Sequence, residues 1–164
     1  TDAEALTVDD PANLAFLTQT TLSVDDTKAI ITVLERRFPD IVGPRGEDIC
    51  YATSNRQAAV KSIAASCDLM LVIGAPNSSN SLRLVEVSER EGTNAKLVQR
   101  GSDVELAWFE GVGTLGLTAG ASAPELLVRE VVNKLSDWFD VHEEIIESAK
   151  ERMIFKLPRS LEAV

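Results

Sequence analysis

The feature that most constrains the fold is a run of five apolar residues, Leu69–Ile73, followed at once by small polar residues at 74–81. A short apolar run bounded by turn residues is typical of a strand buried on both faces. A helical pattern follows, so the polar loop lies between a strand and a helix. Backbone N–H groups and the helix dipole at such a place favour an anion. A simpler interpretation of one such loop is a polar turn with Ser79 or Asn80 as helix cap.

The same arrangement occurs three more times. Apolar runs at residues 14–17, 48–49 and 113–117 lead into polar loops at residues 18–23, 50–55 and 118–122, each followed by a helical pattern. Alternating strands and helices predict an α/β fold with a parallel sheet and helices on both of its faces. Because the carboxyl ends of parallel strands share one edge, the four loops are expected to face one pocket.

The patterns also predict where the elements lie. Strands are expected at residues 14–17, 48–49, 69–73, 95–99, 112–117 and 153–157, and helices at residues 24–38, 55–66, 81–91, 103–110, from 122 onward, and 143–152. Ser23 with Asp26, and Ser122 with Glu125, resemble capping boxes. The turn-rich residues 41–47 are the expected domain boundary.

Charge and rare residues exclude several classes of function. The net charge of −10 argues against nucleic acid and acidic membranes as partners, so an anionic ligand must be held by local donors. No apolar run approaches a membrane span, and no signal peptide is visible. Two cysteines are too few for a disulfide framework and fit a reducing, cytoplasmic compartment. The sequence contains one histidine, His142, which argues against a Ser/His/Asp triad within the chain and against a histidine-rich metal site.

The two cysteines differ in their surroundings. Cys67 falls on the apolar stripe of a predicted helix and reads as a core residue. Cys50 lies in a polar loop with Thr53 and Asn55, where a thiolate can act as a nucleophile or a metal ligand. A structural role is the simpler interpretation of a lone cysteine. If Cys50 is a ligand, one cysteine cannot complete an iron–sulfur or zinc site, so the other ligands must come from outside this chain.

Four stretches, at residues 18–27, 48–57, 77–81 and 118–124, together resemble the family of 4-hydroxy-3-methylbut-2-enyl diphosphate reductases. The resemblance runs from about residue 14 to residue 157 and keeps the order of the motifs. It implies the last step of non-mevalonate isoprenoid biosynthesis, in which the substrate loses a hydroxyl to give isopentenyl and dimethylallyl diphosphate. It also implies an oxygen-sensitive 4Fe-4S cluster held by three cysteines, with ferredoxin or flavodoxin as electron donor.

The resemblance assigns roles residue by residue. Cys50 matches the third cluster cysteine, and Thr20 matches a catalytic threonine near the substrate hydroxyl. The remaining matches bind substrate: Gln19, Thr53 and Asn55 line the pocket, and Ser78, Ser79, Asn80 and Ser122 hold the diphosphate.

The resemblance further implies three α/β units around a central cavity. Residues 1–45 would end the second unit, residues 46–122 would form the third, and residues 123–164 would supply C-terminal helices and a strand. The first two cluster cysteines, the catalytic glutamate and the pocket histidines of the family precede Thr1 and are absent from this sequence. The chain is therefore expected to be the C-terminal part of the enzyme and inactive alone. An α/β module that binds a phosphorylated ligand without redox chemistry is the alternative.

Overall fold

The computed structural model describes residues 2–149. Its helices and strands, in chain order, are α1 (Asp2–Ala5), α2 (Val24–Arg37), α3 (Tyr51–Ala64), β1 (Leu69–Ile73), α4 (Ser79–Arg90), β2 (Ala95–Val98), β3 (Leu115–Ala119) and α5 (Glu125–Ser136), with two 3-10 turns, η1 (Gly101–Asp103) and η2 (Leu106–Phe109), between β2 and β3. The single helix expected at residues 103–110 is thus replaced by these two short turns.

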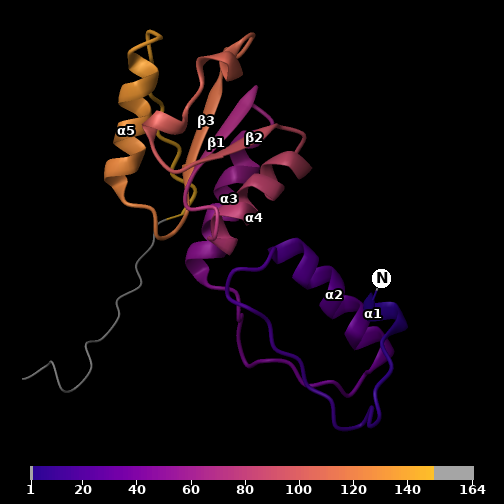
Figure 1. Cartoon of the computed structure of the whole chain (residues 1–164). Coiled ribbons are helices and arrows are strands. Elements are labelled where there is room, and N and C mark those ends of the chain that lie inside the picture. The colour runs from indigo at the N-terminus through magenta and orange to yellow at the C-terminus, as the bar shows by residue number, and fades with distance from the viewer. Residues whose placement is uncertain (1, 150–164) are drawn as a thin grey trace, which may run out of the picture.

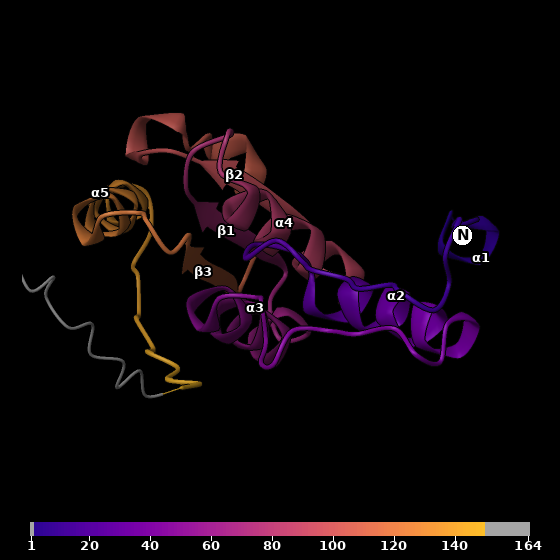
Figure 2. The same cartoon turned by 90° about the horizontal axis from the view of Figure 1, so that it is seen from below.

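A three-stranded parallel sheet forms the centre of the fold, in the order β2-β1-β3. All five residues of β1 are buried because the strand has a neighbour on each side and helices on each face. Leu71 and Ile73 pack with Val131 of α5, whereas Met70 and Val72 pack under α3 and α4. Figures 1 and 2 show α3 and α4 on one side of the sheet and α5 on the other. The predicted α/β fold with a parallel sheet is confirmed.

Residues 2–45 stand beside this sheet and do not extend it (Figure 1). The strand expected at residues 14–17 is wrong, since Ala15 forms a single parallel bridge with Val42 and Leu17 is 83% exposed. Helix α2 begins as predicted, with the Ser23 hydroxyl accepting the N–H of Asp26. The Asp26 carboxylate does not complete a capping box, because it pairs with Arg90 of α4.

The strand end expected at residues 48–49 is also wrong, since these residues form no strand. The polar loop expected at residues 50–55 is shorter than predicted, because helix α3 already begins at Tyr51. The Cys50 carbonyl accepts the N–H groups of Thr53 and Ser54, which closes the first helical turn. The Cys50 N–H donates to the Thr20 carbonyl, so this segment pairs with the N-terminal part of the chain rather than with the sheet.

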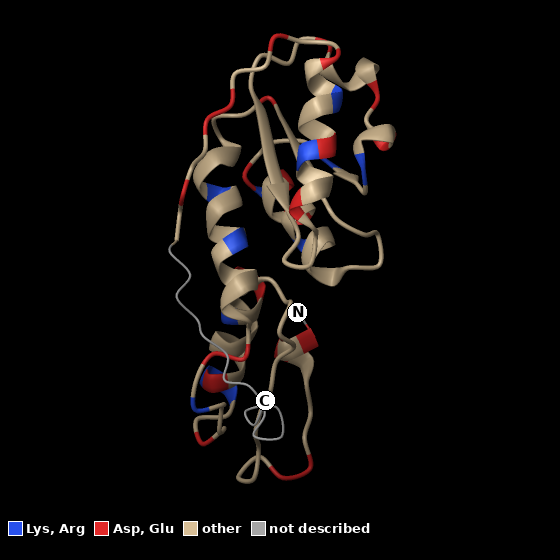
Figure 3. Ribbon diagram, turned by 90° about the vertical axis from the view of Figure 1, so that its left-hand side faces the viewer, with Lys and Arg blue, Asp and Glu red and all other residues tan. Residues whose placement is uncertain are grey.

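The region after β3 differs from the prediction in two ways. Helix α5 begins at Glu125 with Pro124 as its cap residue, and Ser122 is exposed and does not cap it, so the predicted capping box is wrong. Residues 143–149 lack the expected helix. The strand expected at residues 153–157 lies outside the described residues. Figure 3 shows basic and acidic residues interspersed along the ribbon.

Candidate functional site

The loop between β1 and α4 forms the first wall of the site. Ser78 is the N-cap of α4, and its hydroxyl oxygen accepts the N–H of Ser81 at 3.3 Å and the Ser81 hydroxyl at 3.1 Å. The cap is therefore Ser78, one or two residues before the caps expected from the sequence. Ser79 is exposed in the first turn of the helix. The positive end of α4 thus carries hydroxyl groups and opens at the carboxyl end of β1.

Asn80 is the most unusual residue of this wall. It is only 6% exposed, yet neither its side-chain nitrogen nor its oxygen has a hydrogen-bond partner among residues 2–149. A buried polar group without a partner costs about 1–3 kcal/mol, so such groups are normally satisfied by a ligand or ordered water. Asn80 therefore has the unused hydrogen-bonding capacity that a ligand site requires.

Two glycines allow the backbone to come close to this helix start. A Cβ atom on Gly74 would lie 2.1 Å from the Ser81 hydroxyl oxygen, and one on Gly120 would lie 2.4 Å from the same atom. A Cβ atom on Gly120 would also lie 3.7 Å from Nδ2 of Asn80. The loop after β3 therefore reaches the start of α4, which brings the region of Ser122 toward Asn80.

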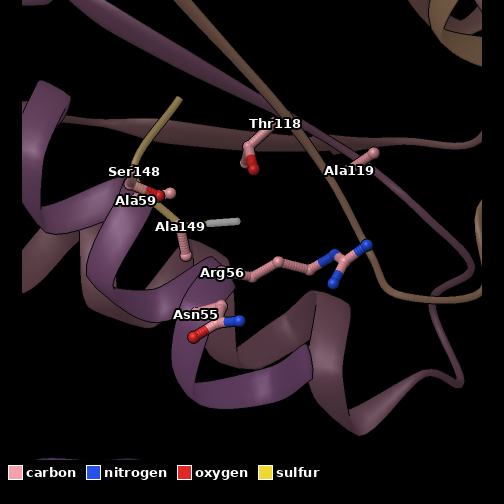
Figure 4. Close-up of a pocket in the computed structure, with 7 residues that line it drawn as sticks. All are labelled: Asn55, Arg56, Ala59, Thr118, Ala119, Ser148 and Ala149. Carbon is pink, nitrogen blue, oxygen red and sulfur yellow. The ribbon is translucent and has the colours of Figure 1, made fainter. Parts of the chain in front are cut away.

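A cavity of about 280 Å³ lies between α3 and the end of β3, lined by Asn55, Arg56, Ala59, Thr118, Ala119, Ser148 and Ala149. Figure 4 shows Asn55 and Arg56 projecting from α3 below Thr118 and Ala119. Nη1 of Arg56 donates to the Ala52 carbonyl at 3.1 Å. The sequence predicted Asn55 as a site residue but did not lead us to Arg56. The signal for Arg56 was its positive charge, directly after a polar loop residue in the sequence.

Cys50 lies at the positive end of α3. It is a free, half-buried cysteine at the N-cap position, and its side chain makes no capping hydrogen bond. The deprotonated thiolate is the form of cysteine that binds metals. The Cys50 N–H donates to the Thr20 carbonyl at 2.9 Å, so the segment that carries Gln19 and Thr20 lies directly beside the cysteine. Thr53 is buried within the first turn of α3, whereas Gln19 and Thr20 are exposed.

Cys67 has a different environment from Cys50. It packs against the core under α3 and α4, and its thiol donates to the Ile63 carbonyl at 3.3 Å. Burial, with a smaller contribution from the nearby Asp68 charge, raises the pKa of the Cys67 thiol. Both features fit the structural role expected from the sequence. Residues 2–149 hold no group of three or more metal-ligating side chains, and no helix in this range is long and apolar enough to cross a membrane.

The structure therefore brings the predicted residues together in three neighbouring places. Gln19 and Thr20 lie beside Cys50, Asn55 lies across a cavity from Thr118, and Asn80 lies beside Gly120. All three places adjoin the starts of α3 and α4 or the carboxyl end of β3.

Known proteins are similar to this chain in sequence and in fold. The chain is 59% identical to 4-hydroxy-3-methylbut-2-enyl diphosphate reductase 2 of Rhodopseudomonas palustris and 55% identical to the reductase of Roseobacter denitrificans, in each case over 98% of the chain. It spans about half the length of these relatives, 50% and 51%. The solved reductase of Plasmodium falciparum is 35% identical, with a TM-score of 0.77 over 91% of the chain and 49% of that protein. The LytB protein family matches residues 1–136, and the chain belongs to this family.

Proposed function

We propose that the chain is the C-terminal part of a reductase that converts 4-hydroxy-3-methylbut-2-enyl diphosphate into isopentenyl and dimethylallyl diphosphate. The observation that carries the proposal is the match of relatives with this name to 98% of the chain at 55–59% identity. The reaction takes two electrons and two protons, breaks the C–O bond of the allylic hydroxyl and releases water. It belongs to the non-mevalonate pathway, and a cytoplasmic ferredoxin or flavodoxin is the proposed electron donor.

The diphosphate binds at the start of α4 in this proposal. Asn80 offers its unpaired amide N–H to a phosphate oxygen, and Ser78 and Ser79 add hydroxyl groups at the positive end of the helix. Ser122 contributes from the loop after β3. This arrangement of local donors suits a chain with a net charge of −10, whose overall field would repel the ligand.

Cys50 fits one ligand of an iron–sulfur cluster because its thiol is free and lies at a helix N-terminus. A 4Fe-4S cluster would supply electrons and an open iron for the substrate hydroxyl. No second cysteine of residues 2–149 joins Cys50 in a metal-ligating group, so the proposed partners of Cys50 lie outside this range.

The reacting end of the substrate lies between Cys50 and the walls of the pocket. Thr20 is the proposed catalytic residue, because its hydroxyl can hydrogen-bond the substrate hydroxyl and hold it in place for loss as water. Gln19, Thr53 and Asn55 are proposed to orient the allylic chain. Residues 1–45 would belong to the second of three α/β units, residues 46–122 to the third and residues 123–164 to a C-terminal segment, all bordering one central cavity.

The test is iron and acid-labile sulfide per chain after anaerobic reconstitution, with turnover measured on the same sample. The assay compares residues 1–164 with a version extended at the N-terminus. We expect a cluster and both products only in the extended protein, and their loss in Cys50→Ser. Cys67→Ser is the matched control and should keep the cluster. A colourless protein that still binds pyrophosphate would contradict the proposal and favour the binding module.

A further inference from the structure

Gln57 joins two parts of the chain through a buried side-chain amide. It lies on α3 and is 2% exposed. Its Oε1 accepts the N–H of Val24 at 3.0 Å, and its Nε2 donates to the Leu22 carbonyl at 2.9 Å. One side chain thus satisfies a donor and an acceptor of the backbone at the start of α2. The Gln57 side chain is buried and the two backbone partners are half-buried, so both bonds are partly shielded from water and their loss would leave polar groups poorly satisfied.

The segment held by Gln57 is the one that carries Gln19 and Thr20. Its other end is tied by the Thr18 N–H, which donates to Oδ2 of Asp48 at 2.8 Å. Between these points, the Thr20 carbonyl accepts the Cys50 N–H at 2.9 Å. The backbone of the segment is therefore fixed to the residues around Cys50, while the side chains of Gln19 and Thr20 stay exposed.

Ion pairs at the surface also hold the start of α2 against α3 and α4. Asp26 pairs with Arg90 of α4 through two bonds of 2.7 and 2.8 Å, and Asp25 pairs with Lys61 of α3. Exposed ion pairs of this kind contribute little and weaken with salt. The buried amide of Gln57 is therefore the contact best able to fix the position of the segment.

We propose that Gln57 is a positioning residue, whose amide sets where Gln19 and Thr20 lie relative to Cys50. It touches no reacting atom and acts through the backbone at Leu22 and Val24. Its consequence for catalysis rests on the function proposed above, whereas its effect on the segment does not. Loss of this amide should displace Thr20 from the substrate hydroxyl without changing the diphosphate site on α4.

The experiment uses the intact reconstituted protein and the substitution Gln57→Met, which keeps the length of the side chain and removes both hydrogen bonds. Hydrogen exchange followed by mass spectrometry reports on peptides that cover residues 18–24, 48–57 and β1. We expect exchange in the first peptide, and at Cys50 in the second, to rise about tenfold or more, with β1 unchanged. The value of kcat per bound cluster should fall about tenfold or more, with unchanged pyrophosphate affinity.

Two controls separate positioning from a loss of stability. Gln99→Met makes the same chemical change at an exposed site, and Val60→Ala weakens the buried face of α3 away from Leu22. Both should leave kcat per bound cluster near the wild-type value. If Gln57→Met unfolds the protein, Gln57→Glu decides, because it keeps the acceptor for Val24 and removes the amide donor to Leu22. We expect faster exchange at residues 18–22 in this variant also.

The proposal would be overturned if residues 18–24 of a folded Gln57 variant exchanged hydrogen as slowly as in the wild type. It would also be overturned if kcat fell only in proportion to the amount of bound cluster. A wild-type protein that exchanges as expected but reduces no allylic diphosphate would leave the positioning role intact and refute the proposed function instead. The two conclusions therefore fail on different measurements.

Discussion

Asn80→Ala should stabilise the ligand-free protein, although it removes a residue of the proposed diphosphate site. The side chain is 6% exposed and neither amide atom has a partner among residues 2–149. Each unpaired buried group costs about 1–3 kcal/mol, and the small cavity left by the substitution offsets part of the gain. We expect a net gain of about 1–2 kcal/mol. For a chain of this length, each kcal/mol corresponds to about 2–4 °C in Tm.

In the presence of pyrophosphate, the wild-type protein should instead have a higher Tm than Asn80→Ala. A ligand at 100 times its Kd stabilises the folded state by about 2.7 kcal/mol, which the wild type gains and Asn80→Ala does not. The assay is thermal unfolding followed by circular dichroism, with and without pyrophosphate. Asn133→Ala is the matched control, because this asparagine is exposed on α5 and reports only the helix preference for alanine. A lower Tm for ligand-free Asn80→Ala, with an undiminished pyrophosphate shift, would refute the reasoning.

Three further substitutions test the site and the sheet. Gly120→Ala should weaken pyrophosphate binding, measured by calorimetry, about tenfold or more, because its Cβ atom would lie 2.4 Å from the Ser81 hydroxyl oxygen. Gly46→Ala is the control in the same measurement, because a Cβ atom there meets nothing within 4 Å. Ser122→Ala should lower pyrophosphate affinity without changing Tm, because this serine caps no helix; an unchanged Kd would remove it from the site. The backbone N–H groups of Gly113 and Thr114, ahead of β3, donate to the Asp68 carboxylate and lower its pKa. The stability that this carboxylate gives the folded protein is therefore fully present above the unfolded-state pKa of about 4, and it is lost as the pH falls through the lower folded-state pKa. Asp68→Asn should therefore flatten the acid limb of a stability–pH curve, and an unchanged limb would contradict this assignment.

The sequence predicts the central strand well because its pattern has one physical solution. Five consecutive apolar residues at Leu69–Ile73 can all be buried only if both faces and both edges of the strand are covered, and β1 meets this condition. Residues 14–17 are apolar too, but a short run does not reveal whether a neighbouring strand exists. Ala15 finds only a single bridge to Val42, and Leu17 remains exposed. What distinguishes the two apolar runs is whether each pairs with neighbouring strands. This depends on residues far away in the sequence.

Residues 48–55 illustrate a second limit of prediction from the sequence. A short run such as Ile49-Cys50-Tyr51-Ala52 suits a strand or a buried helix equally well, and periodicity cannot separate them. The structure begins α3 at Tyr51, so Cys50 caps a helix instead of ending a strand. The misassigned boundary therefore hid the position of Cys50 at a helix start, where its free side chain makes no capping hydrogen bond.

The two most informative features of the site depend on contacts between distant segments. Asn80 was predictable as a loop residue, but its unpaired amide becomes visible only when Gly120 and the buried start of α4 are placed around it. Gln57 lies on the helix that the sequence predicted, and its spacing gives no sign that it holds Leu22 and Val24. Sequence motifs select residue types that can bind a ligand, whereas burial decides which of them cannot be satisfied without one. By this criterion Asn80 is the residue on which a search for the ligand should begin, and Gln57 is a residue that the fold itself already satisfies.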